Sequence, residues 1–165
     1  MEIFLGSSKT GLRRAEKLKK LLESESEGRI TCTLWSETNA FRFSYTTIEN
    51  LIDIGNCLRQ NNGKAILLFT PDDKIFINYG KADEKEYLAA RDNVIFELGL
   101  FWGILGQDNV ICVRPGNIEG FRILSDWNGV NDALYEYKKT RIEFGLKEVA
   151  KKIIASIQYG FIPKR

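Results

Sequence analysis

Apolar residues along the chain form two alternating patterns, which predict a series of strands and helices. Short β-branched or continuously apolar runs indicate strands, and stretches with one apolar face indicate helices. The expected strands cover residues 2–5, 29–35, 64–70 and 109–114, with at most one short edge strand within 115–139. The expected helices cover residues 12–24, 46–59, 91–105 and 144–157. Because strands and helices alternate, an α/β domain with a parallel sheet and right-handed crossovers is expected.

Four clear strands and one short edge strand fit a flavodoxin-like sheet with the strand order 2-1-3-4-5. The chain has 165 residues, which suits a single domain with its own core. The charged segment 71–90 is predicted to be one long loop, and such loops inside compact domains are usually functional or mobile. Thr46 and Glu49 have the spacing of a capping box and predict the start of a helix.

Composition narrows the classes of protein to consider. The net charge is +2, which is too small to favour binding to nucleic acid or to a membrane. We expect a cytoplasmic protein, since no apolar run reaches the ~20 residues of a membrane span and the first residues do not resemble a signal peptide. Cys32, Cys57 and Cys112 lie far apart among apolar residues, so buried reduced thiols are expected rather than a disulfide or a catalytic thiol.

The chain contains no histidine, so the most common general base and metal ligand is absent. Any chemistry must then be done by carboxylates, hydroxyls or the backbone. Glu97 lies in an otherwise almost wholly apolar or glycine-containing run, RDNVIFELGLFWGILG. Because burying a bare carboxylate is costly, Glu97 is the first candidate for a catalytic residue. The alternative is a boundary residue paired with Arg91 or a lysine.

The expected topology places a ligand crevice at the carboxyl ends of the first and third strands. The first strand ends at Gly6-Ser7-Ser8, a loop that is either a cradle of backbone N–H groups for phosphate or a plain turn. The third strand ends at Thr70-Pro71-Asp72-Asp73. Its two aspartates either belong to a solvated turn or form a metal-binding pair, and we expect no metal. Arg91, Asp92 and Asn93 begin the helix that carries Glu97, and Asp92 there is either a cap or a site residue.

A lone carboxylate in such a crevice suits cleavage of a sugar–nitrogen bond. The reaction passes through an oxocarbenium-like state, which a nearby carboxylate stabilises. If the leaving group is nicotinamide, it departs neutral from a cationic ring and needs no general acid. The absence of histidine is then no obstacle.

Several of these segments together resemble a known family. IFLGSS, Trp35, LLFTPDD, ARDNVIFELGLFWGILG and the later Ser125–Gly129 segment are similar to bacterial TIR-like domains of CBASS and Pycsar anti-phage systems, including the TIR domain fused to bacterial STING. The resemblance spans nearly the whole chain, and its most specific part is the block around Glu97. It implies a flavodoxin-like TIR fold and an NAD⁺ glycohydrolase, with NAD⁺ as substrate and no cofactor.

The resemblance also implies roles for individual residues. Glu97 matches the family's catalytic glutamate, and Gly6, Ser7 and Ser8 match the first loop of its nucleotide pocket. Asp73, Arg91 and Asn93 fall in matched blocks and are candidates for substrate binding. Many NAD-cleaving TIR domains have a tryptophan four residues before the glutamate, where this chain has Asn93. A ring that stacks on the base must then come from elsewhere, with Trp35 and Phe43 as candidates.

The resemblance further implies activation by self-assembly of TIR domains under a cyclic-nucleotide sensor such as STING, fused or associated. Residues 1–165 would be a single effector domain, placed N-terminally in a longer protein. Two other interpretations keep the same fold. One is a nucleoside deoxyribosyltransferase-like enzyme with Glu97 as nucleophile, and the other is a non-enzymatic interaction or nucleotide-binding module.

Overall fold

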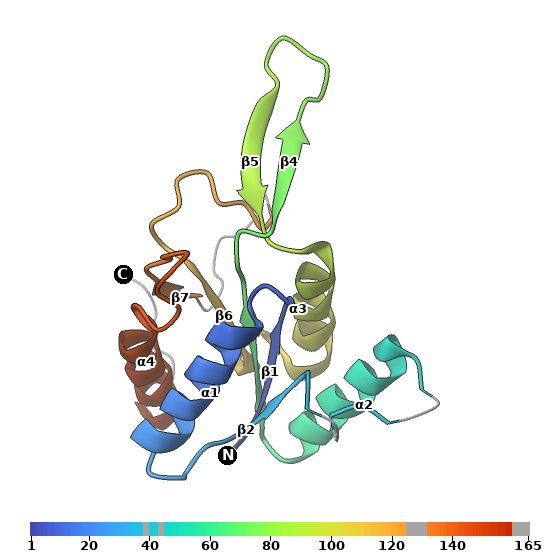
Figure 1. Ribbon diagram of the computed structural model, residues 1–165. Helices are drawn as coiled ribbons and strands as arrows, with labels where there is room; N and C mark the ends of the chain where they lie inside the picture. Colours follow the sequence, from blue (N-terminus) through green and yellow to red (C-terminus); the bar gives the residue numbers. More distant parts are fainter. Residues whose placement is uncertain (38–39, 43–44, 125–131, 160–165) are drawn as a thin grey trace.

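Five parallel strands form the central sheet, in the order β2-β1-β3-β6-β7. A computed structural model describes residues 1–37, 40–42, 45–124 and 132–159 (Figure 1). The sheet strands are β1 (Glu2–Ser7), β2 (Thr31–Leu34), β3 (Lys64–Leu68), β6 (Val110–Pro115) and β7 (Asp132–Tyr135). Counted along the sheet, this is the predicted order 2-1-3-4-5, and β7 is the short edge strand expected within 115–139. The flavodoxin-like α/β fold is therefore confirmed.

Helices cover both faces of the sheet (Figure 1). They are α1 (Leu12–Glu25), α2 (Thr47–Gln60), α3 (Asp92–Leu105) and α4 (Leu146–Tyr159), with a short 3₁₀ helix η1 (Gln107–Asn109) before β6. Ile3 and Leu5 of β1 pack in the core under α1 and α4. Phe4, between them, packs in the core under α2 and α3, as alternation along a strand requires. Among the described residues, no helix is long and apolar enough to cross a bilayer.

The start of α2 has the predicted capping box. The Thr46 hydroxyl accepts a hydrogen bond from the Glu49 backbone N–H at 3.2 Å. The Thr46 backbone N–H donates in return to the Glu49 carboxylate at 2.7 Å. Two N–H groups at the helix start are thus satisfied, which fixes the position of the first turn of α2.

The segment predicted as one long loop is mostly an antiparallel hairpin, so that prediction was wrong. Its strands are β4 (Asp73–Ile77) and β5 (Lys85–Ala89). Asn78 and Gly80 have positive φ values of 56° and 74°, which allows the chain to reverse. Exposed and partly buried residues alternate along β4, and most of the hairpin projects beyond the body, past the carboxyl ends of the parallel strands (Figure 1).

Side chains close the outer edge of β2. The backbone N–H of Cys32 donates to the Glu23 carboxylate at 3.0 Å, and that of Leu34 donates to the Glu37 carboxylate at 3.1 Å. Lys19 lies between the two acids, with its Nζ 2.6 Å from Glu37 and 3.9 Å from Glu23. The outward-facing amides of this edge strand therefore already have acceptors.

The cysteines only partly match their predicted burial. Cys32 and Cys112 are buried, but Cys57 is exposed. It lies on the solvent side of α2, whose core face carries Leu51 and Leu58. The apolar residues around Cys57 in the sequence are thus not its neighbours on the helix surface, and burial was the wrong inference for this thiol.

Candidate functional site

The carboxyl ends of β1 and β3 lie side by side, as the topology predicted. Gly6 pairs with Leu67, and Ser7 pairs with Leu68. β2 flanks β1 on its other side, and Trp35 follows its last residue. The first loop is consequently held between the segments that follow two neighbouring strands.

Glu97 projects from α3 onto this end of β1. An atom at the Cβ position of Gly6 would lie 3.1 Å from Glu97 Oε2 and 2.7 Å from Leu67 Cδ1. Only a residue without a side chain leaves this space, so Gly6 makes room for the carboxylate. The α3 residues that form its core face are Val94, Leu98, Phe101 and Leu105. Glu97 is half-buried at the border of that face.

No ion pair or hydrogen bond to the Glu97 carboxylate is found among the described residues. Arg91 is paired elsewhere, with its Nε 2.9 Å from Asp73 Oδ2, so the alternative of a Glu97–Arg91 pair was wrong. Burial raises the pKa of Glu97 to about 7, because desolvation disfavours the charged form. An unpaired carboxyl with a strongly raised pKa is typical of a functional site.

Glu97 lines a pocket of about 430 Å³ between α2 and α3. This size is within the ~300–1,000 Å³ of small-molecule sites. The lining residues come from the first two turns of the two helices: Thr47, Ile48, Leu51, Asp92, Asn93, Phe96 and Glu97. Apolar walls with a few polar groups are usual for a ligand site, and here Glu97 is the acidic group nearest to the first loop.

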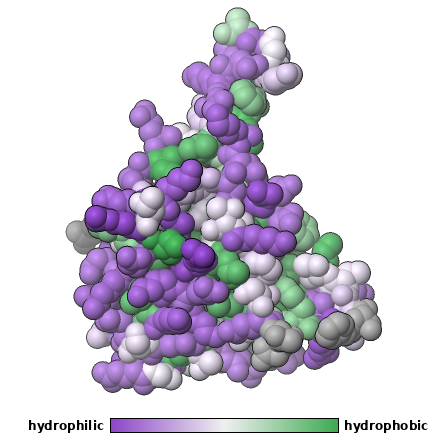
Figure 2. Space-filling view, viewed as in Figure 1, coloured by the Kyte–Doolittle hydropathy of each residue, from purple (hydrophilic) through white to green (hydrophobic). Residues whose placement is uncertain are grey.

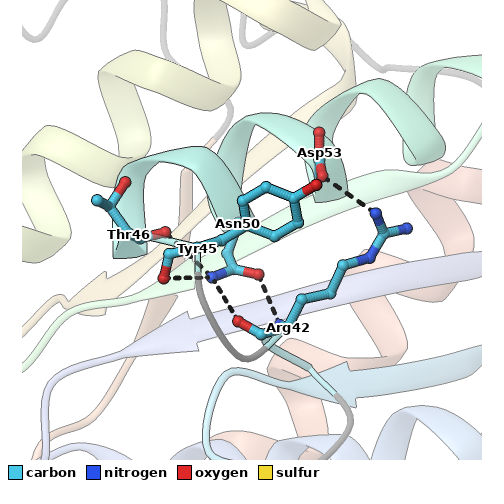
Figure 3. Close-up of polar contacts among 5 residues, drawn as sticks. All are labelled: Arg42, Tyr45, Thr46, Asn50 and Asp53. Atoms are coloured by element: carbon cyan, nitrogen blue, oxygen red, sulfur yellow. Dashed lines mark hydrogen bonds and ion pairs between the residues drawn. The ribbon is translucent and has the colours of Figure 1, made fainter.

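Asn50 fixes the chain that leads into this pocket wall (Figure 3). Its buried amide oxygen accepts from the Arg42 backbone N–H at 2.6 Å. The amide nitrogen donates to the carbonyls of Tyr45 and Thr46 at 3.3 and 3.0 Å. The Arg42 guanidinium also lies 3.5 Å from Asp53. The start of α2, and with it the pocket wall, is therefore tied to the preceding segment through one buried side chain.

Hydrogen bonds also fix the first loop. The Trp35 indole N–H donates to Ser7 Oγ at 3.1 Å. Ser8 Oγ lies 3.2 Å from Thr70 Oγ1 and accepts from the Gly11 N–H at 3.1 Å. Both serines are buried. Hydrogen bonds thus hold the loop against the ends of β2 and β3, and the hydroxyls of both serines already have hydrogen-bond partners.

The structure brings most of the predicted site residues to one edge of the sheet, but not all into the pocket. Glu97 and Asn93 line the pocket, and Gly6 lies against Glu97. Ser7, Ser8 and Trp35 are hydrogen-bonded at the adjoining ends of the strands and are not among the lining residues. The remaining pair, Asp73 and Arg91, joins the hairpin base to the start of α3. Phe43 and the Ser125–Gly129 segment lie outside the described residues.

Sequence reasoning missed the apolar wall of the pocket. Ile48 and Phe96 line it, and both are more than half exposed. A signal was present, since Phe96 is a large apolar residue directly before Glu97 and off the core stripe of α3. Among the described residues there is no cluster of three or more acidic or cysteine side chains that could hold a metal ion. The chemistry that these residues offer is electrostatic, through the Glu97 carboxylate, with Asp92 as the second acidic side chain of the lining.

The chain is similar to known bacterial proteins. It matches the family described as CAP12/Pycsar effector protein, TIR domain, over residues 2–137. It is 26% identical to CD-NTase-associated protein 12 of Lachnospiraceae bacterium (strain RUG226), over 97% of this chain and 48% of that protein. The identity to CD-NTase-associated protein 12 of Flavobacterium daejeonense is 31%, over 96% of this chain and 47% of that protein.

A shorter match covers part of a second kind of effector. The chain is 44% identical over 63 residues to the Pycsar effector protein BcPycTIR of Burkholderia cepacia, which is 36% of this chain and 20% of that protein. The chain spans about half the length of the two CD-NTase-associated proteins. The similarity therefore concerns one part of those longer proteins.

Proposed function

The chain belongs to the TIR-domain family of CBASS and Pycsar effector proteins, and from this premise we propose that it is an NAD⁺ glycohydrolase. One observation carries the proposal: Glu97, whose half-buried carboxyl has no ion pair or hydrogen bond among the described residues, lines a pocket of suitable size at the carboxyl edge of the sheet. The family description names an effector, and neither it nor the relatives' names state a reaction, so the proposed activity rests on the site.

In the proposed reaction, the bond between ribose C1′ and the nicotinamide nitrogen breaks. Its electron pair stays on nicotinamide, which leaves as a neutral molecule. The ionised Glu97 carboxylate stabilises the positive charge that develops on the ribose. Water then adds to C1′ and releases a proton, which gives ADP-ribose; attack by a group of the same nucleotide would give a cyclised form instead.

The walls of the pocket suit this substrate. Phe96 and Ile48 offer apolar surface to the flat nicotinamide ring, and excluding water there strengthens the interaction of Glu97 with the cation. Asn93 stands at the position where many relatives with this activity have tryptophan, and it supplies an amide in place of a ring. The rigid first loop, with its buried Ser7 and Ser8, is expected to hold the nucleotide through backbone groups.

The wider biological role is part of the same proposal. Residues 1–165 form one effector domain that is activated when copies assemble in response to a cyclic-nucleotide sensor, such as a STING domain, fused or associated. Depletion of NAD⁺ would then limit phage growth in the infected cell. The predicted cytoplasmic location belongs to this proposal as well, because NAD⁺ is present there.

The test is release of nicotinamide from NAD⁺ by the purified protein over a rising concentration series. Glu97→Gln removes only the charge, and Glu16→Gln is a matched control, since Glu16 is exposed on α1 in the opposite layer. Release should be lost in the first variant and retained in the second. If the parent protein is inactive, fusion to an oligomeriser supplies assembly. A clustered, folded protein that still releases no nicotinamide would favour a scaffold module instead.

A further inference from the structure

We propose that the outer edge of β4 is a docking surface for a second copy of this chain, with the two β4 strands pairing antiparallel. This deepens the assembly part of the proposed function, but it does not depend on NAD⁺ cleavage. The hairpin projects beyond the body (Figures 1 and 2), so its edge is accessible. A two-stranded ribbon is marginal on its own, which makes a further strand stabilising.

The direction of the free backbone groups on β4 follows from β5. The Arg122 backbone N–H donates to the Leu88 carbonyl at 2.8 Å, so this carbonyl points away from β4. Leu88 is paired with Lys74. In an antiparallel ladder, when the backbone groups of one residue of a pair point away from the neighbouring strand, those of its partner do so as well. By alternation, the N–H and C=O groups of Lys74 and Phe76 point to the open side of β4.

The open edge of β4 contrasts with two other strand edges. The outward amides of β2 are occupied by Glu23 and Glu37, and β5 is covered at its base by the segment around Arg122. Within the described residues, no group outside the hairpin bonds to the backbone of Lys74 or Phe76. The outward backbone groups of Lys74 and Phe76 are therefore available for pairing with a further strand.

The partner that fits is a second copy, because β4 is self-complementary in one register. When Ile75 of each copy lies opposite the other, Lys74 lies opposite Phe76 in both directions. The outward backbone groups of these two residues then bond to each other. Each Lys74 ammonium, which pairs with Glu86 of its own hairpin at 2.8 Å, would lie beside an aromatic ring rather than a like charge. Phe76 is 46% exposed in the single chain, and pairing would cover it. A shift of two residues either way would place Lys74 opposite Lys74 or Phe76 opposite Phe76.

This register also connects assembly to the candidate site. The hairpin of the second copy would run back alongside Pro71, at the carboxyl edge of the sheet. Its tip is ordered by local bonds, with the Gly80 N–H donating to the Glu84 carboxylate at 2.6 Å. A defined tip would therefore lie near Arg91 and the start of α3, so pairing can affect the site that carries Glu97.

Disulfide trapping tests the register without any use of NAD⁺. In a Cys57→Ser background, which removes the exposed thiol, Ile75→Cys places two thiols directly opposite each other across the pair. Tyr79→Cys is the control, because Tyr79 at the tip is 80% exposed and would react faster by random collision. Pairing predicts that Ile75→Cys cross-links on the order of tenfold faster than Tyr79→Cys, as pairing raises the local thiol concentration. Equal or faster cross-linking of Tyr79→Cys would overturn the proposal.

Phe76→Pro gives a second, independent measurement. Proline removes the outward N–H and blocks the edge, while the hydrogen bonds within the hairpin remain possible. In sedimentation velocity, the parent protein should associate as its concentration rises, and the proline variant should stay monomeric with an unchanged thermal melt. Identical sedimentation of the two proteins would refute pairing through β4. Since neither experiment measures catalysis, failure of the proposed enzyme activity would leave these results unaffected.

Discussion

Replacing Glu97 with glutamine should abolish NAD⁺ cleavage and at the same time stabilise the fold at neutral and basic pH. The substitution keeps the shape of the side chain and removes only its charge. A residue retained for folding should behave in the opposite way, because its loss would destabilise the protein. The two readouts together therefore separate a functional carboxylate from a structural one.

The size of the effect follows from the pKa of Glu97, which burial raises from 4.5 to about 7. The folded protein binds this proton more tightly than the unfolded chain. The free energy of unfolding should thus fall as pH rises from about 4.5 to about 7, and stay constant above that. At about 1.4 kcal/mol per pKa unit, the ionised carboxylate costs up to ~3 kcal/mol. Glu97 keeps contact with solvent in the pocket, so about 1–2 kcal/mol is expected after screening.

The assay is urea unfolding of the parent protein and Glu97→Gln at pH 5 and pH 8, together with nicotinamide release at pH 8. Near pH 5 the two proteins should unfold at similar urea concentrations, because Glu97 is then mostly protonated. At pH 8 the variant should be the more stable by about 1–2 kcal/mol. A variant that is less stable than the parent protein at pH 8 would refute the reasoning and assign Glu97 a structural role.

Four further outcomes can be checked with the same protein. Nicotinamide release by the parent protein should rise with pH through about 7, because the ionised Glu97 carboxylate is the active form, and a kcat/KM profile would show this. Gly6→Ala should lower the free energy of unfolding in urea by about 1–3 kcal/mol and remove most of the activity, since the methyl group would lie 2.7 Å from a leucine carbon. The control Gly99→Ala should not destabilise the fold, because the space around Gly99 is open. Asn50→Ala should cost about 2 kcal/mol and raise KM, because buried backbone partners lose their bonds. In the native protein, a thiol reagent should label Cys57 quickly and the two buried cysteines only on unfolding.

The sheet order and the position of Glu97 could be predicted because both follow from local patterns. Apolar runs identified the central strands, and their alternation with helices fixed the parallel topology. The expected ligand crevice at the carboxyl ends of the first and third strands then predicted that Gly6 and the start of α3 lie close together, although they are far apart in sequence. The contact between Gly6 and Glu97 required the structure, because it depends on how closely α3 packs on β1.

The hairpin and the pocket wall could not be read from the sequence for different physical reasons. Most of the hairpin stands outside the core, so its strands lack the buried apolar run that identified β3, and each begins with two charged residues instead of showing a polar–apolar alternation. The wall that Ile48 and Phe96 form depends on how α2 and α3 lie beside each other. Burial of Cys57 was misjudged because neighbours in sequence are not neighbours on a helix surface.

The closed edge of β2 determines what kind of oligomer strand pairing can build. Glu23 and Glu37 occupy the outward amides on that side, so the central sheet cannot be extended there by another chain. Pairing of β4 with β4 is related by a two-fold axis and closes after two copies. Pairing through β4 would therefore give discrete dimers rather than an open-ended ribbon, and a filament of this protein would need a further contact on a different surface.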